Sequence, residues 1–338
     1  MKHLRRIFLV CGIGIFFVLI HQIGWATIAD HFRRLGWWIF PIFAVSVIWC
    51  WTSTLAWRRI LRQHRRAVGR FTLFRIRLAG DAVSTLTPVN FLGGDPFRIY
   101  LLKRYHPWTE GAASVVIDRT IHSLAILVTV LIGCTAAFWR IPNIPLNIRY
   151  GLPIVLCVAS VFIGWLFVHQ RRGLFGFLMH AAKRLRLRRE FTAPTVTRFE
   201  ELDALIADFY HKDPAGFWMA FGYHFANRFL GIVEVYLIGM LAHPQFGFIE
   251  ATILAGLAPI VNFLFTFIPG AIGVLEGAYT AVLYLLHLPS AVGVTIQIVR
   301  RLRAAIWIGL GFLLMDTRER KTLLQEAHLV SSSSTKRA

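Results

Sequence analysis

The stretch GDAVSTLTPVNFLGGDPFRIYLL (residues 80–102) decides how this chain folds. It lies in an apolar region, residues 72–103, that is long enough to cross a bilayer, yet proline, glycine and acidic residues interrupt it. Broken backbone is stable at membrane depth only where protein or a water-filled cavity covers it. The stretch therefore predicts a helical hairpin that enters the membrane and returns, rather than a straight span.

The composition of the whole chain also indicates a membrane protein. Of its 338 residues, 56% are hydrophobic and only 16% are charged, whereas soluble domains are about 45–50% apolar and about 25% charged. A second interrupted region, 248–287, predicts a second hairpin. Six segments carry the roughly 20 apolar residues that a transmembrane helix needs: 7–28, 37–56, 112–138, 150–168, 215–241 and 291–315. The predicted fold class is an all-α polytopic membrane protein with six transmembrane helices and two re-entrant helical hairpins.

The basic residues predict the orientation of these spans. A net charge of +20 would also fit a nucleic-acid partner, but the lysines and arginines cluster between the hydrophobic runs. With six spans, 27 of the 37 fall on one side and four on the other. The larger group occupies residues 1–6, 57–77, 103–104, 170–213 and 316–338. The positive-inside rule then places both termini in the cytoplasm, which we expect to be that of a bacterium with this protein in its inner membrane.

We expect one membrane domain, residues 1–315, followed by a partly disordered cytoplasmic tail, residues 316–338. The basic and then apolar start resembles a signal peptide, but no cleavage site follows it, which favours a retained first span. The largest cytoplasmic loop, 170–213, begins with a basic amphipathic segment suited to anionic headgroups and continues with a surface helix. This loop is too small for an enzyme domain.

An internal repeat relates the two interrupted regions. A shift of 181 residues aligns Pro88 with Pro269, Asp95 with Glu276, and Arg119 with Arg300. The halves would be residues 1–138 and 150–315, each with three full crossings. Because three is odd, the second half must be inverted relative to the first, an architecture that recurs in transporters. The first hairpin would then enter from the cytoplasm and the second from the periplasm.

Charged side chains at membrane depth are costly unless they are paired or hydrated, so they are candidates for function. Asp95 and Arg98 stand one helical turn apart and can pair. Gly93 and Gly94, just before them, either open a half-helix whose N–H groups suit a phosphate or simply turn the hairpin. Other charged residues occur on three predicted spans: Asp118, Arg119 and His122; Arg228 and Glu234; Arg300, Arg301 and Arg303.

Two interpretations of these charges remain open. They line one polar interior that favours an anion, because arginine binds phosphate through two hydrogen bonds. Alternatively, they form salt bridges that only hold the spans together, for example Asp118 with Arg300 or Glu234 with Arg228.

Motifs for enzymatic chemistry are missing. The sequence has no HExxH, GxSxG, P-loop or DxD motif and no Cys/His metal cluster. We therefore expect no catalytic residue, metal or cofactor, and the sequence leans away from an enzyme without excluding one.

The run GDAVSTLTPVNFLGGDPFRIYLLKR with SVVIDRTIHSLAIL, and the later run FIPGAIGVLEGAYTAVLYLLHLPSAVGVTIQIVRRL, resemble the lysylphosphatidylglycerol synthase transmembrane-region family of flippase-like membrane proteins. The resemblance implies a membrane domain that moves a phospholipid or related anionic lipid between leaflets. By match to the family motifs, the site would be lined by Pro88, Gly93, Gly94, Asp95, Arg98, Asp118, Arg119, Pro269, Gly273, Glu276, Gly277 and Arg300. The charge analysis adds Arg228 and Glu234.

The chain departs from the family in one respect. Members that add lysine to phosphatidylglycerol carry a large soluble domain after the membrane part, and this sequence stops soon after its last span, so we do not expect aminoacylation. The leading hypothesis is a flippase-like lipid transporter whose partners are membrane lipids with anionic headgroups. The alternatives are a membrane-embedded lipid-modifying enzyme and a non-transporting partner subunit in a hopanoid or glycolipid pathway. Lipid-pathway enzymes or a second copy of the chain are further candidate partners.

Overall fold

The chain is a bundle of α-helices. A computed structural model describes residues 30, 33, 35–61, 68–86, 90–142, 144–185, 192–266, 268 and 271–315, and no strand occurs among them. A short 3-10 turn, η1 (Gly36–Trp38), leads into the first long helix. The helices are α3 (Ile39–Leu61), α4 (Arg70–Leu86), α5 (Asn90–Leu102), α6 (Trp108–Arg140), α7 (Leu146–Arg172), α8 (Leu174–Arg184), α9 (Ala193–Lys212), α10 (Pro214–Ala242), α11 (Phe248–Leu264), α12 (Val274–Leu285) and α13 (Ser290–Leu313).

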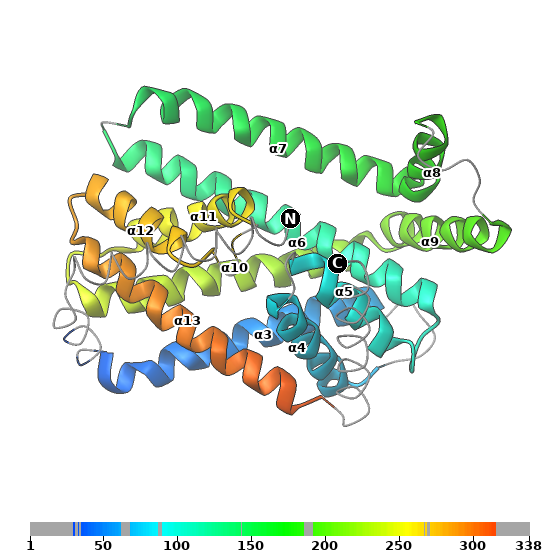
Figure 1. Cartoon of the computed structure of the whole chain (residues 1–338), viewed down its shortest axis with the longest axis horizontal. Coiled ribbons are helices and arrows are strands. Elements are labelled where there is room, and N and C mark those ends of the chain that lie inside the picture. The colour runs from blue at the N-terminus through cyan, green and yellow to red at the C-terminus, as the bar shows by residue number, and fades with distance from the viewer. Residues whose placement is uncertain are drawn as a thin grey trace, which may run out of the picture.

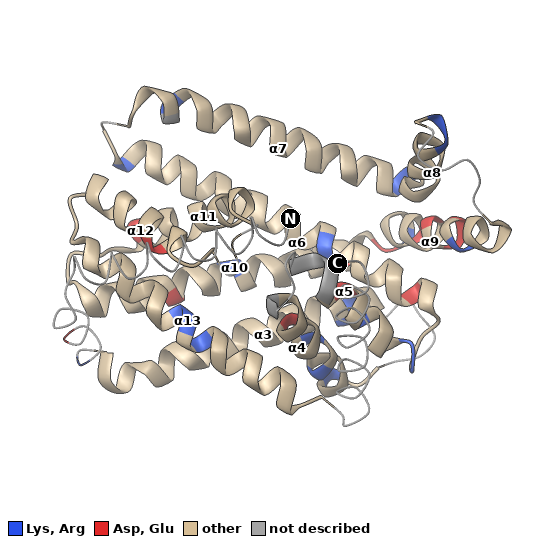
Figure 2. Cartoon of the chain, in the orientation of Figure 1, with Lys and Arg blue, Asp and Glu red and all other residues tan. Residues whose placement is uncertain are grey.

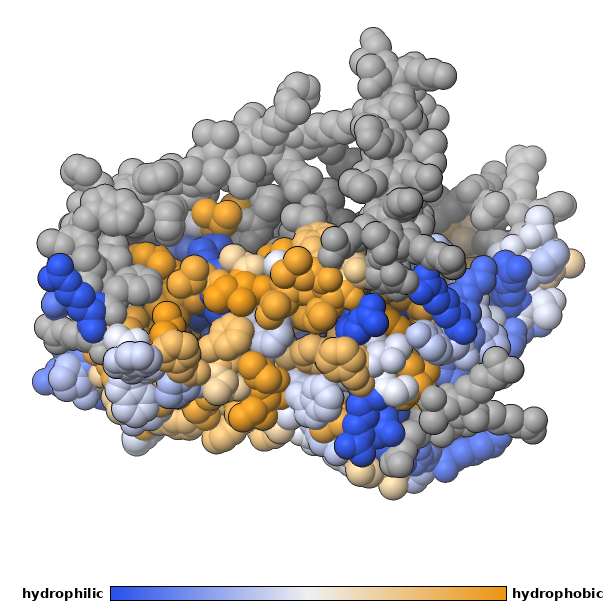
Figure 3. Space-filling model, turned by 90° about the horizontal axis from the view of Figure 1, so that it is seen from below, coloured by the Kyte–Doolittle hydropathy of each residue, from blue (hydrophilic) through white to orange (hydrophobic). Residues whose placement is uncertain are grey.

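Four helices in the described part of the chain are long and apolar enough to cross a membrane. They are α3 with η1, α6, α7 and α10, which run along the long dimension of the bundle (Figure 1). They match the predicted spans 37–56, 112–138, 150–168 and 215–241. On the face seen in Figure 3, apolar residues gather in the middle and hydrophilic ones toward the two ends. The fold class, an all-α polytopic membrane protein, is confirmed.

The other two predicted spans have different outcomes. Segment 291–315 forms α13, whose 24 residues are enough to cross, but its three arginines set it apart from the four helices above. Segment 7–28 lies outside the described residues, as does the tail 316–338.

Both interrupted regions fold as pairs of helices. Region 72–103 forms α4 and α5, which pack against each other, and region 248–287 forms α11 and α12. The α4–α5 pair lies toward the end of the bundle that carries α9, and α12 lies toward the opposite end (Figure 1). Because α5 already begins at Asn90, Gly93 and Gly94 lie inside the helix rather than ahead of it. Gly94 instead allows α5 to pack closely on α4, since a Cβ there would lie 1.8 Å from the Ser84 Oγ on α4.

The repeat stays a prediction, and it makes a demand on the packing between the two halves. If α3, α4, α5 and α6 correspond to α10, α11, α12 and α13, the contact of α4 with α13 should be mirrored by a contact of α11 with α6. Both contacts occur. Helices α3 and α10, which this correspondence exchanges, pack extensively against each other. A twofold relation between the halves would produce this arrangement.

The loop 170–213 contains two helices, as its patterns predict. Helix α8 carries Lys183 and Arg184 in its last turn. Asp203 on α9 accepts hydrogen bonds from the N–H groups of Phe175 and Gly176 at the start of α8, at 3.0 and 2.8 Å. Helix α9 also buries Tyr210, which donates to Gln170 of α7 at 3.1 Å, and this burial raises the pKa of its phenol. The loop is therefore fixed to the end of the bundle.

Helices α6 and α11 come into backbone contact at Gly133 and Gly256. A Cβ on Gly133 would lie 2.7 Å from the Gly256 Cα and 2.9 Å from the Thr252 carbonyl oxygen, closer than a real Cβ approaches. Small residues allow this kind of helix contact inside a membrane. The contact joins the third span of the first half to the hairpin of the second.

Replacement of Gly133 by alanine should therefore separate the two helices and lower the free energy of unfolding by about 1–3 kcal/mol. The matched control is Gly164→Ala on α7, where a Cβ meets nothing within 4 Å. Unfolding in mixed detergent micelles, followed by tryptophan fluorescence, measures both. Equal stability of the two variants would contradict the close contact.

Candidate functional site

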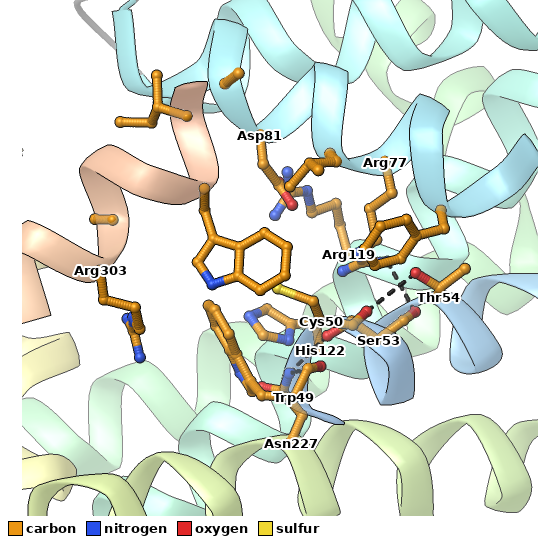
Figure 4. Close-up of a pocket in the computed structure, with 16 residues that line it drawn as sticks. Trp49, Cys50, Ser53, Thr54, Arg77, Asp81, Arg119, His122, Asn227 and Arg303 are labelled. Carbon is orange, nitrogen blue, oxygen red and sulfur yellow. Dashed lines mark hydrogen bonds between the residues drawn. The ribbon is translucent and has the colours of Figure 1, made fainter. Parts of the chain in front are cut away.

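A cavity of about 230 Å³ lies between α3, α4, α6, α10 and α13. We call it the first cavity. Its walls combine aromatic residues, among them Trp49, Phe74 and Trp307, with charged and polar groups (Figure 4). The charged and polar groups include Arg77, Asp81, Arg119, His122, Asn227 and Arg303. Such a lining suits a ligand that is part charged and part apolar.

Asp95 connects the first hairpin to α6. The Nε and Nη2 of Arg119 donate to its two carboxylate oxygens at 2.7 and 2.6 Å. Arg98, which is almost fully buried, donates to Asp95 at 3.3 Å and also pairs with Asp81. Gly80 leaves space for Arg98, because a Cβ there would lie 2.4 Å from the Arg98 Cγ. The expected pairing of Asp95 with Arg98 is present, and Arg119 joins it.

Asp118 is the centre of a second group. Its Oδ2 accepts from the Nη1 of Arg77 at 3.3 Å, and its Oδ1 lies 2.9 Å from the Nε2 of His224. The Nδ1 of His224 lies 3.3 Å from the Nδ1 of His122. The suggested pairing of Asp118 with Arg300 does not form. Arg77 pairs with Asp118 in place of Arg300. The sequence predicts Arg77 to be one of the cytoplasmic loop residues 57–77, but it lies buried on α4.

A smaller cavity of about 80 Å³ adjoins the first. This second cavity is lined by Arg228, Glu234, Asn262, Arg300 and further residues of α3, α10, α11 and α13. Trp49, Asn227 and Arg303 line both cavities, and the guanidinium of Arg303 lies over the Trp49 ring, 5.0 Å from its centroid. Arg119 and Arg300 therefore line two adjoining cavities rather than one.

Arginines outnumber carboxylates in the second cavity. Glu234 pairs with Arg303, and the same oxygen lies 3.7 Å from the Nε of Arg300. Arg300 also donates to the Tyr279 hydroxyl at 3.0 Å. Within the described residues Arg228 makes no hydrogen bond or ion pair, and its Nε is buried. The suggested pairing of Glu234 with Arg228 is therefore absent, and three guanidinium groups surround one carboxylate.

Glu276 connects the second hairpin to α13 as Asp95 connects the first to α6. It accepts from the Gly273 N–H at 2.9 Å, which caps α12, and from the Nε and Nη2 of Arg301. Arg119 binds Asp95 through the same two nitrogens. The paired residues are 24 positions apart in the first half and 25 in the second. The counterpart of Arg119 is thus Arg301, not Arg300. Neighbouring residues on a helix point about 100° apart, which turns Arg300 toward Tyr279 and Glu234.

The remaining predicted site residues are spread between these groups. Gly93 lies in α5, and Gly277 lies in α12 with open space beside its Cα. Pro88 and Pro269 lie outside the described residues. The predicted site set lacked Arg77, Tyr279, Arg301 and Arg303. The spacing of Arg77 and Asp81, one turn apart on a single helix face, was the available signal for Arg77. In the described part of the chain, no group of His, Cys, Asp and Glu has the make-up of a metal site.

Spanning helices, two interrupted hairpins and charged residues between them define a polytopic membrane protein of the class in which discontinuous helices surround a buried polar site. The chain belongs to the lysylphosphatidylglycerol synthase TM region family, whose model matches residues 6–311. A UPF0104 membrane protein of Methanothermobacter thermautotrophicus is 30% identical over 148 residues, which cover 41% of this chain and 43% of that protein. The chain thus spans a little under half the length of this relative. No solved structure matches the chain.

The pairing of Glu276 with Arg301 can be tested by a double-mutant cycle. Glu276→Gln and Arg301→Gln should show a coupling of about 1–3 kcal/mol in the free energy of unfolding, because Arg301 is the ion-pair partner of the fully buried Glu276 carboxylate. Glu276→Gln with Arg300→Gln is the matched control and should show coupling near zero. Unfolding in mixed micelles measures both cycles. A larger coupling of Glu276 to Arg300 than to Arg301 would contradict the pairing and support the alignment of Arg119 with Arg300.

Proposed function

We propose that this protein is a flippase-like transporter that moves an anionic phospholipid, or a related envelope lipid, between leaflets. Membership of its family supports a role with membrane lipids. The observation that carries the finer proposal is the second cavity, where Arg228 is partly buried, its Nε fully so, and pairs with no carboxylate of the described residues.

Burial of the Arg228 Nε without a hydrogen-bond partner is costly, because that part of the guanidinium loses its hydration and gains no counter-charge from the described residues. Nearby Arg300 and Arg303 increase the cost, since they share one carboxylate, Glu234. A phosphate would relieve it, because arginine forms two parallel charge-assisted hydrogen bonds to phosphate oxygens. The chemistry of the cavity therefore favours a ligand with a negatively charged, phosphate-like group.

The two cavities supply a route for such a headgroup. In this proposal the headgroup occupies the first cavity near Arg77 and Arg119, passes Trp49 and Arg303, and reaches the second. The aromatic walls accommodate the apolar parts of the lipid. The two hairpins, each held to the following helix by acid–arginine pairing, would move in turn and expose the headgroup to one side and then the other. Asp95, Arg98, Asp118, Gly273, Glu276 and Gly277 would support this site rather than contact the phosphate.

The orientation is part of the proposal. Basic residues gather at the end of the bundle formed by α4, α8 and α9 (Figure 2). This end would face the cytoplasm of a bacterial inner membrane under the positive-inside rule. The lysine and arginine on α8 would then lie near anionic headgroups.

Replacement of Arg228 by glutamine should slow leaflet transfer of a labelled anionic phospholipid by about tenfold or more, which corresponds to loss of one charge-assisted hydrogen bond. The variant should keep its stability, because the residue removed has no protein partner in the described chain. The exposed Arg149, replaced in the same way, is the matched control and should transfer lipid as the wild type does. The assay is dithionite quenching of labelled phosphatidylglycerol in proteoliposomes.

The same assay separates the alternatives. Unchanged transfer in Arg228→Gln would exclude the second cavity from the route. Absence of transfer by the wild type, together with a covalent change of the lipid seen by mass spectrometry, would favour a lipid-modifying enzyme instead. Absence of both would favour a non-transporting partner subunit.

A further inference from the structure

We propose that His122 and His224 form a proton-binding pair that takes up a proton when an anionic headgroup occupies the first cavity. The inference rests on the proposed function and adds to it a coupling ion. Lipid transfer would then be accompanied by proton movement.

The hydrogen bonds of His224 determine where its protons lie. Its Nε2 is 2.9 Å from Asp118 Oδ1, and the other oxygen of Asp118 accepts from Arg77. A carboxylate that already faces a guanidinium is ionised and can only accept, so His224 Nε2 carries a proton. His224 is fully buried and Asp118 nearly so. This end of the chain of contacts is therefore closed to water.

The contact between the two histidines then has two forms. Their Nδ1 atoms lie 3.3 Å apart, so one must donate and the other accept. When both rings are neutral, His122 donates from Nδ1 to the bare Nδ1 of His224. The Nε2 of His122 is then the nitrogen left for the first cavity, which His122 lines (Figure 4).

Proton uptake exchanges the donor and acceptor roles of the two Nδ1 atoms and keeps the hydrogen bond between them. A proton from the cavity binds His122 Nε2, and the Nδ1 proton of His122 passes to His224 Nδ1. His224 becomes an imidazolium hydrogen-bonded to Asp118, and His122 stays neutral with its proton on Nε2. One proton has entered and no other bond has changed. A second proton would place two imidazolium rings in contact, which their repulsion opposes.

The surrounding charges link this step to an anion. Burial of the ring, together with Arg228 on α10 and Arg119 on α6, opposes a positive charge on His122. Two more arginines, Arg77 on α4 and Arg303 on α13, line the same cavity. On the acidic side, Asp118 contacts the pair, and Asp81 on α4 lines the same cavity; from α3 the neutral thiol of Cys50 lines it too. In the proposal, the pair therefore binds its proton only when a ligand reduces the positive charge around it. A negatively charged headgroup beside Arg77 and Arg119 offsets their charge, and binding and protonation then favour each other.

A histidine pair with a purely structural role would need only a hydrogen bond, and one variant separates the two roles. In His122→Asn, the amide nitrogen occupies the place of Nδ1 and can still donate to His224, but the side chain cannot take up a proton. The matched control is His180→Asn on α8, where the native ring contacts the Gly176 carbonyl and no other hydrogen-bond partner among the residues that the structure describes.

Calorimetric titration of the purified full chain with dihexanoylphosphatidylglycerol, in two buffers of different ionisation enthalpy near neutral pH, counts the protons. The wild type and His180→Asn should take up about one proton per bound lipid. His122→Asn should bind the lipid without proton uptake. The zwitterionic dihexanoylphosphatidylcholine should cause no uptake in any of them.

Equal binding enthalpies of the wild type in the two buffers would overturn the proton pair and leave the lipid transporter standing, and so would unchanged uptake in His122→Asn. Failure of the wild type to bind the anionic lipid at all would overturn both proposals. In proteoliposomes, a pH gradient should change the rate of phosphatidylglycerol transfer by the wild type. The wild-type measurements decide the question even where His122→Asn does not fold.

Discussion

The need to neutralise charge inside an apolar bundle determines most of this structure. Arg119 with Asp95 and Arg301 with Glu276 each form a side-on pair between a short hairpin helix and the long helix that follows it. Removal of Arg301 would leave the fully buried Glu276 carboxylate without its ion-pair partner, which costs more than the pair itself contributes. The hairpins, whose interrupted backbone could not face lipid, are therefore held against the spans by ion pairs as well as by packing.

Equivalent pairs in the two halves also explain the layout of the cavities. Each pair joins two helices of one half, whereas contacts of α4 with α13 and of α11 with α6 join the halves to each other. The space left between these contacts contains Arg77, Arg228, Arg300 and Arg303, with Asp81, Asp118 and Glu234 as the acids beside them. In the proposed function, a negatively charged headgroup offsets this excess of positive charge.

Much of the fold could be predicted from the sequence, because apolar length and interrupting residues report directly on spans and hairpins. The limits of α3, α6, α7 and α10 follow from hydropathy, and both hairpins follow from their glycines, prolines and acids. Pair partners were harder to predict. The acid and its arginine are 24 residues apart in the first half and 25 in the second, so Glu276 pairs with Arg301 and not with Arg300. Adjacent positions on a helix face different neighbours. Arg77 was assigned to a loop because its sequence neighbours are basic, and only the tertiary fold shows that it reaches Asp118.

The central claim is that the arginine-rich interior binds an anionic headgroup, and an experimental density map would test it most directly. Electron cryomicroscopy of the protein in nanodiscs of phosphatidylglycerol should show a phosphate density in contact with Arg228 and Arg300 or with Arg119 and Arg77. A map in which protein side chains fill both cavities, with Arg228 paired to a carboxylate of the chain, would contradict it.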